Sequence, residues 1–102
     1  MFEVLGFYKF TNIRSLKKNK VFLQDFLIRK KIRGTIIIAN EGLNGTISGD
    51  SKNIKSTTNK LKKIFSFKEF DNSNKSESHF QPFHKPKAVS YTHLTLPTNR
   101  EV

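Results

Sequence analysis

The sequence contains no cysteine, which excludes disulfide bonds, thiolate metal sites and a cysteine nucleophile within these 102 residues. Acidic residues are scarce as well, with 8 Asp and Glu against 19 Lys and Arg. The formal net charge of +11 favours a polyanionic partner, either a nucleic acid or an anionic membrane surface. Lysines that only keep a small domain in solution would give the same balance, so charge alone does not decide between these interpretations.

Long apolar runs are missing too. The longest, Ile36 to Ala39, is far shorter than the ~20 residues that a membrane-spanning helix needs. The first residues carry an acid, Glu3, where a secretory signal would carry lysines, and no cleavage-site pattern follows. We therefore expect a cytoplasmic protein with no membrane contact, and its length indicates one domain.

Segments of strand and helix character alternate along the chain. The aromatic stretch Val4–Phe10 predicts a strand, and the β-branched stretches Thr35–Ala39 and Thr46–Ser48 predict two more. Apolar residues at three-to-four spacing after the first and third of these strands indicate two amphipathic helices. The two stripes comprise Leu16, Leu23, Phe26, Leu27 and Lys30 in the first helix, and Ile54, Thr58, Leu61, Ile64 and Phe65 in the second.

Polar residues and glycines suggest where these elements begin and end. Asn12 or Ser15 could cap the first helix, which Gly34 is expected to end, and Asp50 or Ser51 could cap the second.

A tight hairpin turn is expected over Glu41–Gly45, because Asn44 and Gly45 both tolerate positive φ and Gly42 adds another permissive position. Phe67–Phe70 could form an edge-like segment. The polar stretch Asp71–Ser78 is expected to be a loop.

The order of elements predicts an α+β fold, the split βαβ pattern of a ferredoxin-like βαββαβ sandwich. Two helices on one face of a small antiparallel sheet would bury both apolar stripes. Their outer sides would then form a broad basic surface that could bind phosphates with steep salt dependence. The cations concerned are Lys17, Lys18, Lys20, Arg29, Lys30, Lys31 and Arg33, followed by Lys52, Lys55, Lys60, Lys62 and Lys63.

Residues 89–102 differ in character from the rest of the chain. They show no helical period, and their one Arg and one Glu cancel. The string resembles the translation of a sequencing adapter. We therefore expect a ferredoxin-like domain over residues 1–88, truncated at or before its last strand, and a non-native tail over residues 89–102, although a short native β tail is the alternative.

Three stretches of the sequence resemble those of one protein family. Ala39–Gly49 reads A-N-E-G-L-N-G-T-I-S-G and resembles the E-G-I-N-G-T-(I/V)-S-G block of the bacterial tRNA uridine-34 hydroxylases, which carry a rhodanese domain. Gly34–Ala39 resembles that family's G-T-I-L-L-A strand, and Gln81–Lys87 resembles its P-F-x-(R/K)-x-K stretch. The similarity runs from about Phe7 to Lys87.

The resemblance implies an acylphosphatase-like front domain of an enzyme that converts uridine 34 of certain tRNAs to 5-hydroxyuridine. The chemistry is expected in the rhodanese-type domain and its active-loop cysteine, which these 102 residues do not contain. We therefore expect no catalytic residue, no metal and no cofactor in this chain. Its implied partners are tRNA and the rhodanese-like domain, and its implied task is to position the tRNA or to complete the active cleft.

Two groups of residues are candidate contacts. The first is the motif Glu41, Gly42, Asn44, Gly45 and Thr46, which could touch substrate or the other domain, or could serve only as turn chemistry. The second is a basic, loop-like stretch that could touch RNA, where Phe80 and Phe83 are the only aromatic residues. Its candidates are Phe83, His84, Lys85 and Lys87.

Other functions find less support. The glycine pair of the motif is expected between strands, whereas in KH domains such a pair joins two helices. The RNA-recognition-motif signature is absent. Phe7 to Asn12 shows no arginine-bearing phosphate loop of the acylphosphatase kind. A stand-alone basic RNA-binding module without catalysis and a small-molecule regulatory domain of this fold remain as alternatives.

Overall fold

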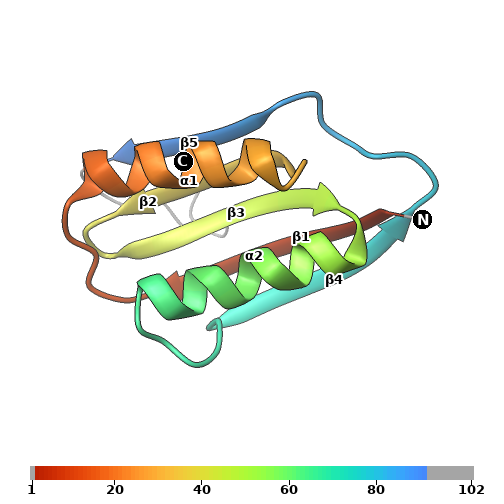
Figure 1. Cartoon of the computed structure of the whole chain (residues 1–102). Coiled ribbons are helices and arrows are strands. Elements are labelled where there is room, and N and C mark those ends of the chain that lie inside the picture. Colours follow the sequence, from red (N-terminus) through yellow and green to blue (C-terminus); the bar gives the residue numbers. More distant parts are fainter. Residues whose placement is uncertain (1, 92–102) are drawn as a thin grey trace, which may run out of the picture.

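The computed structural model describes residues 2–91 as a five-stranded sheet with two helices on one face (Figure 1). The elements are β1 (Phe2–Phe10), α1 (Leu16–Arg29), β2 (Arg33–Ala39), β3 (Gly42–Gly49), α2 (Ser51–Ile64), β4 (Asn72–Ser78) and β5 (Pro86–Tyr91). The strands lie in the order β4-β1-β3-β2-β5. The predicted βαββαβ fold is confirmed.

The sheet is mixed rather than entirely antiparallel. Strands β4, β1, β3 and β2 pair antiparallel to their neighbours, but β5 pairs parallel to β2. The connection from β4 to β5 crosses one end of the sheet, so β5 has to run opposite to β4 (Figure 1). Because β2 also runs opposite to β4, β5 and β2 share one direction.

The core lies between the helices and the sheet face that they cover. Alternate residues of the strands point to this face. On β1 they include Leu5 and Phe7, and on β2 they include Ile36 and Ile38. From the helices the fully or nearly buried side chains are Leu23, Phe26, Leu27, Ile54, Thr57 and Leu61. The predicted stripes are therefore largely confirmed, with buried Thr57 in the place expected for Thr58.

The edge strand β4 occupies a stretch that the sequence pattern assigned to a loop. Asn72–Ser78 pairs along its length with β1, and nearly all of its side chains are exposed. A polar edge strand of this kind needs only backbone pairing and carries no apolar period that would reveal it. The preceding residues are not the expected edge-like segment, because Phe67 and Phe70 pack on the core instead.

The helix ends also differ from expectation in detail. Ser15 and Asp50 are the N-cap residues, but neither side chain makes a capping hydrogen bond. Helix α1 ends at Arg29, and Lys31 takes the left-handed conformation with φ 56°. Gly34 lies inside β2 rather than at the helix end. Its positive φ of 110°, and the Thr46 carbonyl oxygen that a Cβ atom at this position would meet, explain why glycine stands there.

The expected domain boundary after residue 88 falls within β5, which continues to Tyr91. The remainder of the expected non-native tail, residues 92–102, lies outside the described residues. The origin of that tail stays a prediction.

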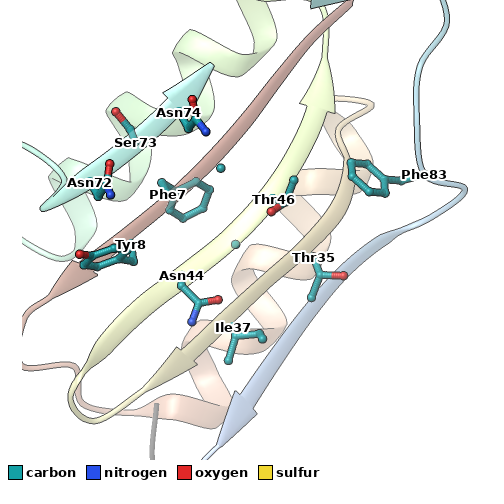
Figure 2. A pocket seen from close by; sticks show the side chains of 12 residues that line it. Phe7, Tyr8, Thr35, Ile37, Asn44, Thr46, Asn72, Ser73, Asn74 and Phe83 are labelled. Atoms are coloured by element: carbon teal, nitrogen blue, oxygen red, sulfur yellow. The ribbon is translucent and has the colours of Figure 1, made fainter. Parts of the chain in front are cut away.

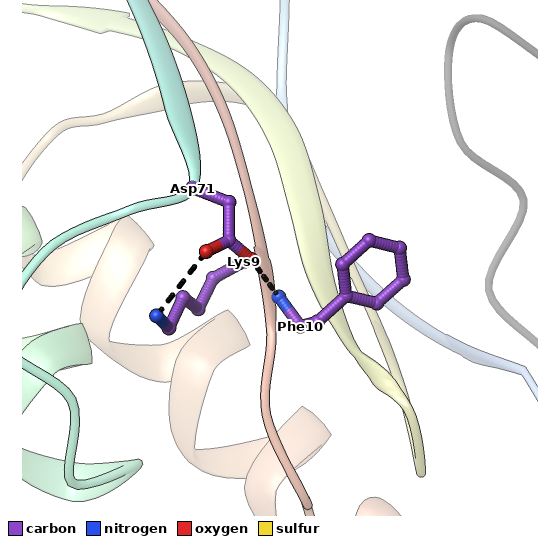
Figure 3. A network of polar contacts seen from close by, with 3 residues as sticks. All are labelled: Lys9, Phe10 and Asp71. Atoms are coloured by element: carbon purple, nitrogen blue, oxygen red, sulfur yellow. Dashed lines mark hydrogen bonds and ion pairs between the residues drawn. The ribbon is translucent and has the colours of Figure 1, made fainter.

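Asp71 holds the start of β4 against β1 (Figure 3). Its Oδ2 atom accepts a hydrogen bond of 2.7 Å from the backbone N–H of Phe10, and its Oδ1 atom lies 3.3 Å from Lys9 Nζ. The pKa of Asp71 lies below its ordinary value of 3.8, mainly because its carboxylate accepts the hydrogen bond from the Phe10 backbone. Lys9 lowers this pKa further.

We expect Asp71 to make the stability of the chain depend on pH in the acid range. Because its pKa is lower in the folded than in the unfolded state, its contribution is present above the unfolded value and is lost as pH falls through the folded value. Urea unfolding at neutral pH should give Asp71→Asn a lower midpoint than the original chain, and this gap should close in strong acid. The control is Glu69→Gln, a substitution at an exposed carboxylate. Its urea midpoint should equal that of the original chain at both pH values.

Candidate functional site

The turn between β2 and β3 consists of Asn40 and Glu41, so it begins one residue before the expected turn and ends at the first residue of that turn. Ala39 pairs with Gly42, so β3 begins immediately after Glu41. The expected hairpin between these two strands is confirmed, but the expected position of its turn over Glu41–Gly45 is wrong, because Asn44 lies within a strand. The segment forms a strand because β3 pairs with β1 on one side and with β2 on the other. This pairing satisfies the backbone hydrogen-bonding groups along both of its edges.

The glycines of the motif are explained by crowding within the sheet. Gly42 has φ 152°, and a Cβ atom there would meet the carbonyl oxygen of Lys9. At Gly45 a Cβ atom would lie 2.5 Å from the Thr35 carbonyl oxygen and 3.0 Å from Phe7 Cζ. Both positions exclude larger residues because backbone atoms of neighbouring strands leave no space.

Strand β3 presents the rest of the motif on the face that the helices leave open, which we call the open face. Asn44 pairs with Tyr8 of β1 and with Ile37 of β2, and Thr46 pairs with Gly6 and Thr35. These residues share one face because paired residues point the same way. Within residues 2–91, α1 and α2 both lie on the other face (Figure 1).

A cavity of about 420 Å³ lies on the open face across β4, β1, β3 and β2. Figure 2 shows Tyr8 and Asn72 on one side of it and Phe83 on the other. Asn44 is only 8% exposed, whereas Thr46 is exposed at the centre of the sheet. The lining residues are Gly6, Phe7, Tyr8, Thr35, Ile37, Asn44, Gly45, Thr46, Asn72, Ser73, Asn74 and Phe83.

The connection between β4 and β5 is anchored at the sheet and carries Phe83 to the cavity. Ser48 Oγ donates a hydrogen bond of 2.8 Å to the Pro82 carbonyl oxygen, and Gln81 Nε2 donates one of 3.0 Å to the Ser48 carbonyl oxygen. Arg33 donates to the carbonyl oxygen of Phe83 at 3.5 Å. Phe83 itself has φ 71° and is 42% exposed. Several contacts therefore fix the backbone beside an aromatic ring that stays accessible.

Within residues 2–91, the strand positions of the open face carry positive charge and no carboxylate. Arg33 and Lys87 flank Thr35, the first on the same strand and the second opposite it on β5. The two acids of the described strands, Glu3 and Glu77, pair with each other in the register of β1 and β4 and point to the helix face. Glu3 forms an ion pair of 3.1 Å with Lys75 there. The open face is thus suited to an anionic ligand.

The structure brings together some of the candidate residues and separates others. Asn44, Gly45, Thr46 and Phe83 line the cavity, and Lys87 lies at its margin. Glu41 and Gly42 lie at the β2–β3 end of the sheet, while His84 and Lys85 are exposed in the connection before β5. Phe80 is 70% exposed and does not line the cavity.

Sequence reasoning missed Tyr8, Thr35, Ile37, Asn72 and Asn74 as members of this site. For the residues of β1 and β2, alternation along the predicted strands could have placed them on one face. The asparagines of β4 could not be found in this way because the strand itself was not expected.

The helix lysines lie over the opposite face, as expected for two helices on one side of the sheet (Figure 1). Some of them are engaged with aromatic rings. Lys60 Nζ lies 5.6 Å from the ring centre of Phe22, and Lys62 Nζ lies 5.8 Å from that of Phe70. Lys30, Lys31 and Arg33 follow α1 rather than belonging to it.

The connection between β1 and α1 directs backbone donors to the neighbouring turn. Thr11 N–H donates to the Glu41 carbonyl oxygen at 3.0 Å, and Ile13 N–H donates to the Asn40 carbonyl oxygen at 3.1 Å. These two N–H groups of the connection are therefore hydrogen-bonded to the turn between β2 and β3. None of the helices described within residues 2–91 is long and apolar enough to cross a membrane.

A family model described as the UPF0176 acylphosphatase like domain matches residues 2–90. A protein of Pelagibacter ubique (strain HTCC1062), named tRNA uridine(34) hydroxylase, is 67% identical over 87 residues, which are 85% of this chain and 29% of that protein. The protein of the same name from Ehrlichia ruminantium (strain Welgevonden) is 34% identical over 92 residues, covering 84% of this chain and 31% of its own length. The chain thus spans less than a third of these curated relatives.

The fold has counterparts among solved structures. The structure of an acylphosphatase from Coxiella burnetii superposes with a TM-score of 0.61 over 86% of this chain and 92% of its own chain, at 10% sequence identity. At this identity the likeness concerns the arrangement of helices and strands alone.

Proposed function

Since this chain belongs to the UPF0176 family of acylphosphatase-like N-terminal domains, we propose that it acts as the front part of a tRNA uridine(34) hydroxylase. In the whole enzyme its task is to position the tRNA or to complete the active cleft. The observation that carries this proposal is the 67% identity to the corresponding part of a protein with that name. The reaction itself belongs to the remainder of the enzyme, including the rhodanese-like domain, so the chain alone is inactive.

The open face is the surface through which the domain performs this task. It presents Asn44 and Thr46 of the family motif, it is hollowed by the cavity, and its strand positions carry cations without carboxylates. Such a surface suits the ribose, base and phosphate groups of a tRNA segment. Glu41, at the end of the same strand pair, contributes a contact to substrate or to the rhodanese-like domain.

A chimera would test the role of the motif. Residues 2–90 of this chain would replace the matching part of the Pelagibacter relative, and 5-hydroxyuridine in tRNA from cells that carry only the chimera would be measured by mass spectrometry. We expect Asn44→Ala to lower 5-hydroxyuridine about tenfold, because loss of a polar contact to substrate costs on the order of 1–2 kcal/mol. Glu41→Ala should lower it as well.

The matched control is Asn59→Ala, which removes an exposed asparagine on α2, on the other side of the sheet. This control should give the same 5-hydroxyuridine level as the chimera without any substitution. Thermal unfolding of each variant would show that the domain stays folded. A folded Asn44→Ala chimera that gives the full level of 5-hydroxyuridine would contradict the role proposed for the motif. If the chimera without any substitution gave no 5-hydroxyuridine, the assignment to this enzyme would be contradicted.

A second candidate function is a stand-alone basic RNA-binding module. The observation in its favour is the formal net charge of +11, much of it on the exposed outer sides of α1 and α2. This candidate places RNA on the helix face rather than on the open face, and the salt dependence argued in the Discussion separates the two.

A further inference from the structure

We propose that the cavity on the open face binds one unpaired nucleobase of a single-stranded RNA segment. Phe83 and Tyr8 supply aromatic surface for stacking, and the asparagine side chains at the cavity recognise polar atoms on the edge of the base. The inference rests on the proposed function in one respect, that RNA is the substrate, and it names the part of RNA that this site takes.

Aromatic rings stand at two sides of the cavity. Tyr8 comes from β1 and has Phe10 as a neighbour, with ring centres 6.0 Å apart in an edge-on arrangement. Phe83 comes from the connection before β5 and faces the cavity from the other side (Figure 2). Aromatic side chains exposed on a sheet are the usual platform for unstacked RNA bases.

Amide groups provide the means of recognition. Asn72 and Asn74 are exposed on β4 at the rim, and Asn44 is buried on β3, on the other side of β1. The exposed amides of Asn72 and Asn74 each offer both a donor and an acceptor, which matches the mixed pattern on the edge of a base. The volume of about 420 Å³ falls within the usual range for sites that hold small molecules.

Charge favours RNA over a protein as the occupant. Arg33 and Lys87 lie on either side of Thr35, where they can contact the phosphates next to the bound base. A strand face with two cations and no carboxylate is therefore complementary to a nucleotide.

The test compares two phenylalanines of the same connection. Fluorescence anisotropy would measure binding of the whole chain to a labelled oligouridylate and to an abasic oligonucleotide of the same length. Phe83→Ala should weaken oligouridylate binding roughly tenfold, because stacking on an aromatic ring contributes appreciably for each base. It should leave abasic binding unchanged. Phe80→Ala, which alters a ring outside the cavity, should leave both affinities unchanged.

A conservative variant guards against a folding artefact. Phe83→Tyr keeps the ring and should retain the affinity of the original chain. Equal loss in Phe83→Ala and Phe80→Ala, or equal binding of the oligouridylate and the abasic strand, would overturn the nucleobase site and favour a protein partner for this face. The proposed function would survive that result, because the chimera measures 5-hydroxyuridine independently and fails only if the domain plays no part in the enzyme.

Discussion

Replacing Gly42 by alanine should destabilise the chain by about 3 kcal/mol, a large share of the ~5–15 kcal/mol by which a domain of this size is usually stable. The reason is that a Cβ atom at this position meets the Lys9 carbonyl oxygen and comes within 2.9 Å of Phe10 Cα. Both are backbone atoms of β1, so neither can rotate away. The φ of 152° adds strain for any residue with a side chain.

Gly6→Ala provides the matched control for this substitution. Gly6 lies on β1 in the same sheet, but a Cβ atom there would have Thr46 Oγ1 as its nearest neighbour, at 3.7 Å. This is an ordinary contact, so Gly6→Ala should stay within about 1 kcal/mol of the original chain or be slightly more stable. The measurement is the free energy of unfolding from urea titration.

The comparison decides what the motif glycine does. A large loss for Gly42→Ala with little change for Gly6→Ala would show that Gly42 is required by the packing of β3 against β1. Its presence in the motif would then say nothing about substrate. Equal stability of the two variants would contradict the packing explanation and leave a functional role for Gly42 open to test.

The fold could be predicted from the sequence where apolar periodicity is strong. Both helices show it, because residues such as Leu23 and Leu61 have to face the sheet, and β2 shows it through Ile36 and Ile38. Strand β4 could not be predicted, since its seven residues are all polar and show no apolar period, while the backbone pairs along its length with β1. The direction of β5 could not be predicted either, because it depends on the path of a connection rather than on any residue.

The site was predictable only in part, for a related reason. The motif drew attention to Asn44 and Gly45, but local turn propensity suggested a hairpin turn there. In the structure, pairing with two neighbouring strands overrides that propensity. As a consequence Asn44 and Thr46 lie at the centre of the open face, beside residues of β1 that are distant in sequence, and β4 lies on the other side of β1. Alternation along β1 and β2 could have indicated their shared face, but the sequence contains no signal for the part that β4 contributes.

RNA binding by this chain should weaken by about two orders of magnitude when salt rises from about 50 to 200 mM, if roughly five phosphates are contacted. The physical cause is release of counterions from the RNA by a protein whose formal net charge is +11. Affinities for an oligouridylate at several salt concentrations give the slope of log K against log salt. A chain whose binding does not change with salt would contradict any phosphate-binding role for its basic residues.

The same slope shows which face binds, because one exposed lysine can be neutralised on each side of the sheet. Lys87 lies on the open face beside Thr35, and Lys55 lies on α2. We expect Lys87→Gln to reduce the steepness of the slope by about 0.7, the value for one lost contact with a single strand, and Lys55→Gln to leave it unchanged. The reverse result would place the RNA on the helix face. That outcome would support the stand-alone RNA-binding module and would contradict both the role proposed for the open face and the nucleobase site.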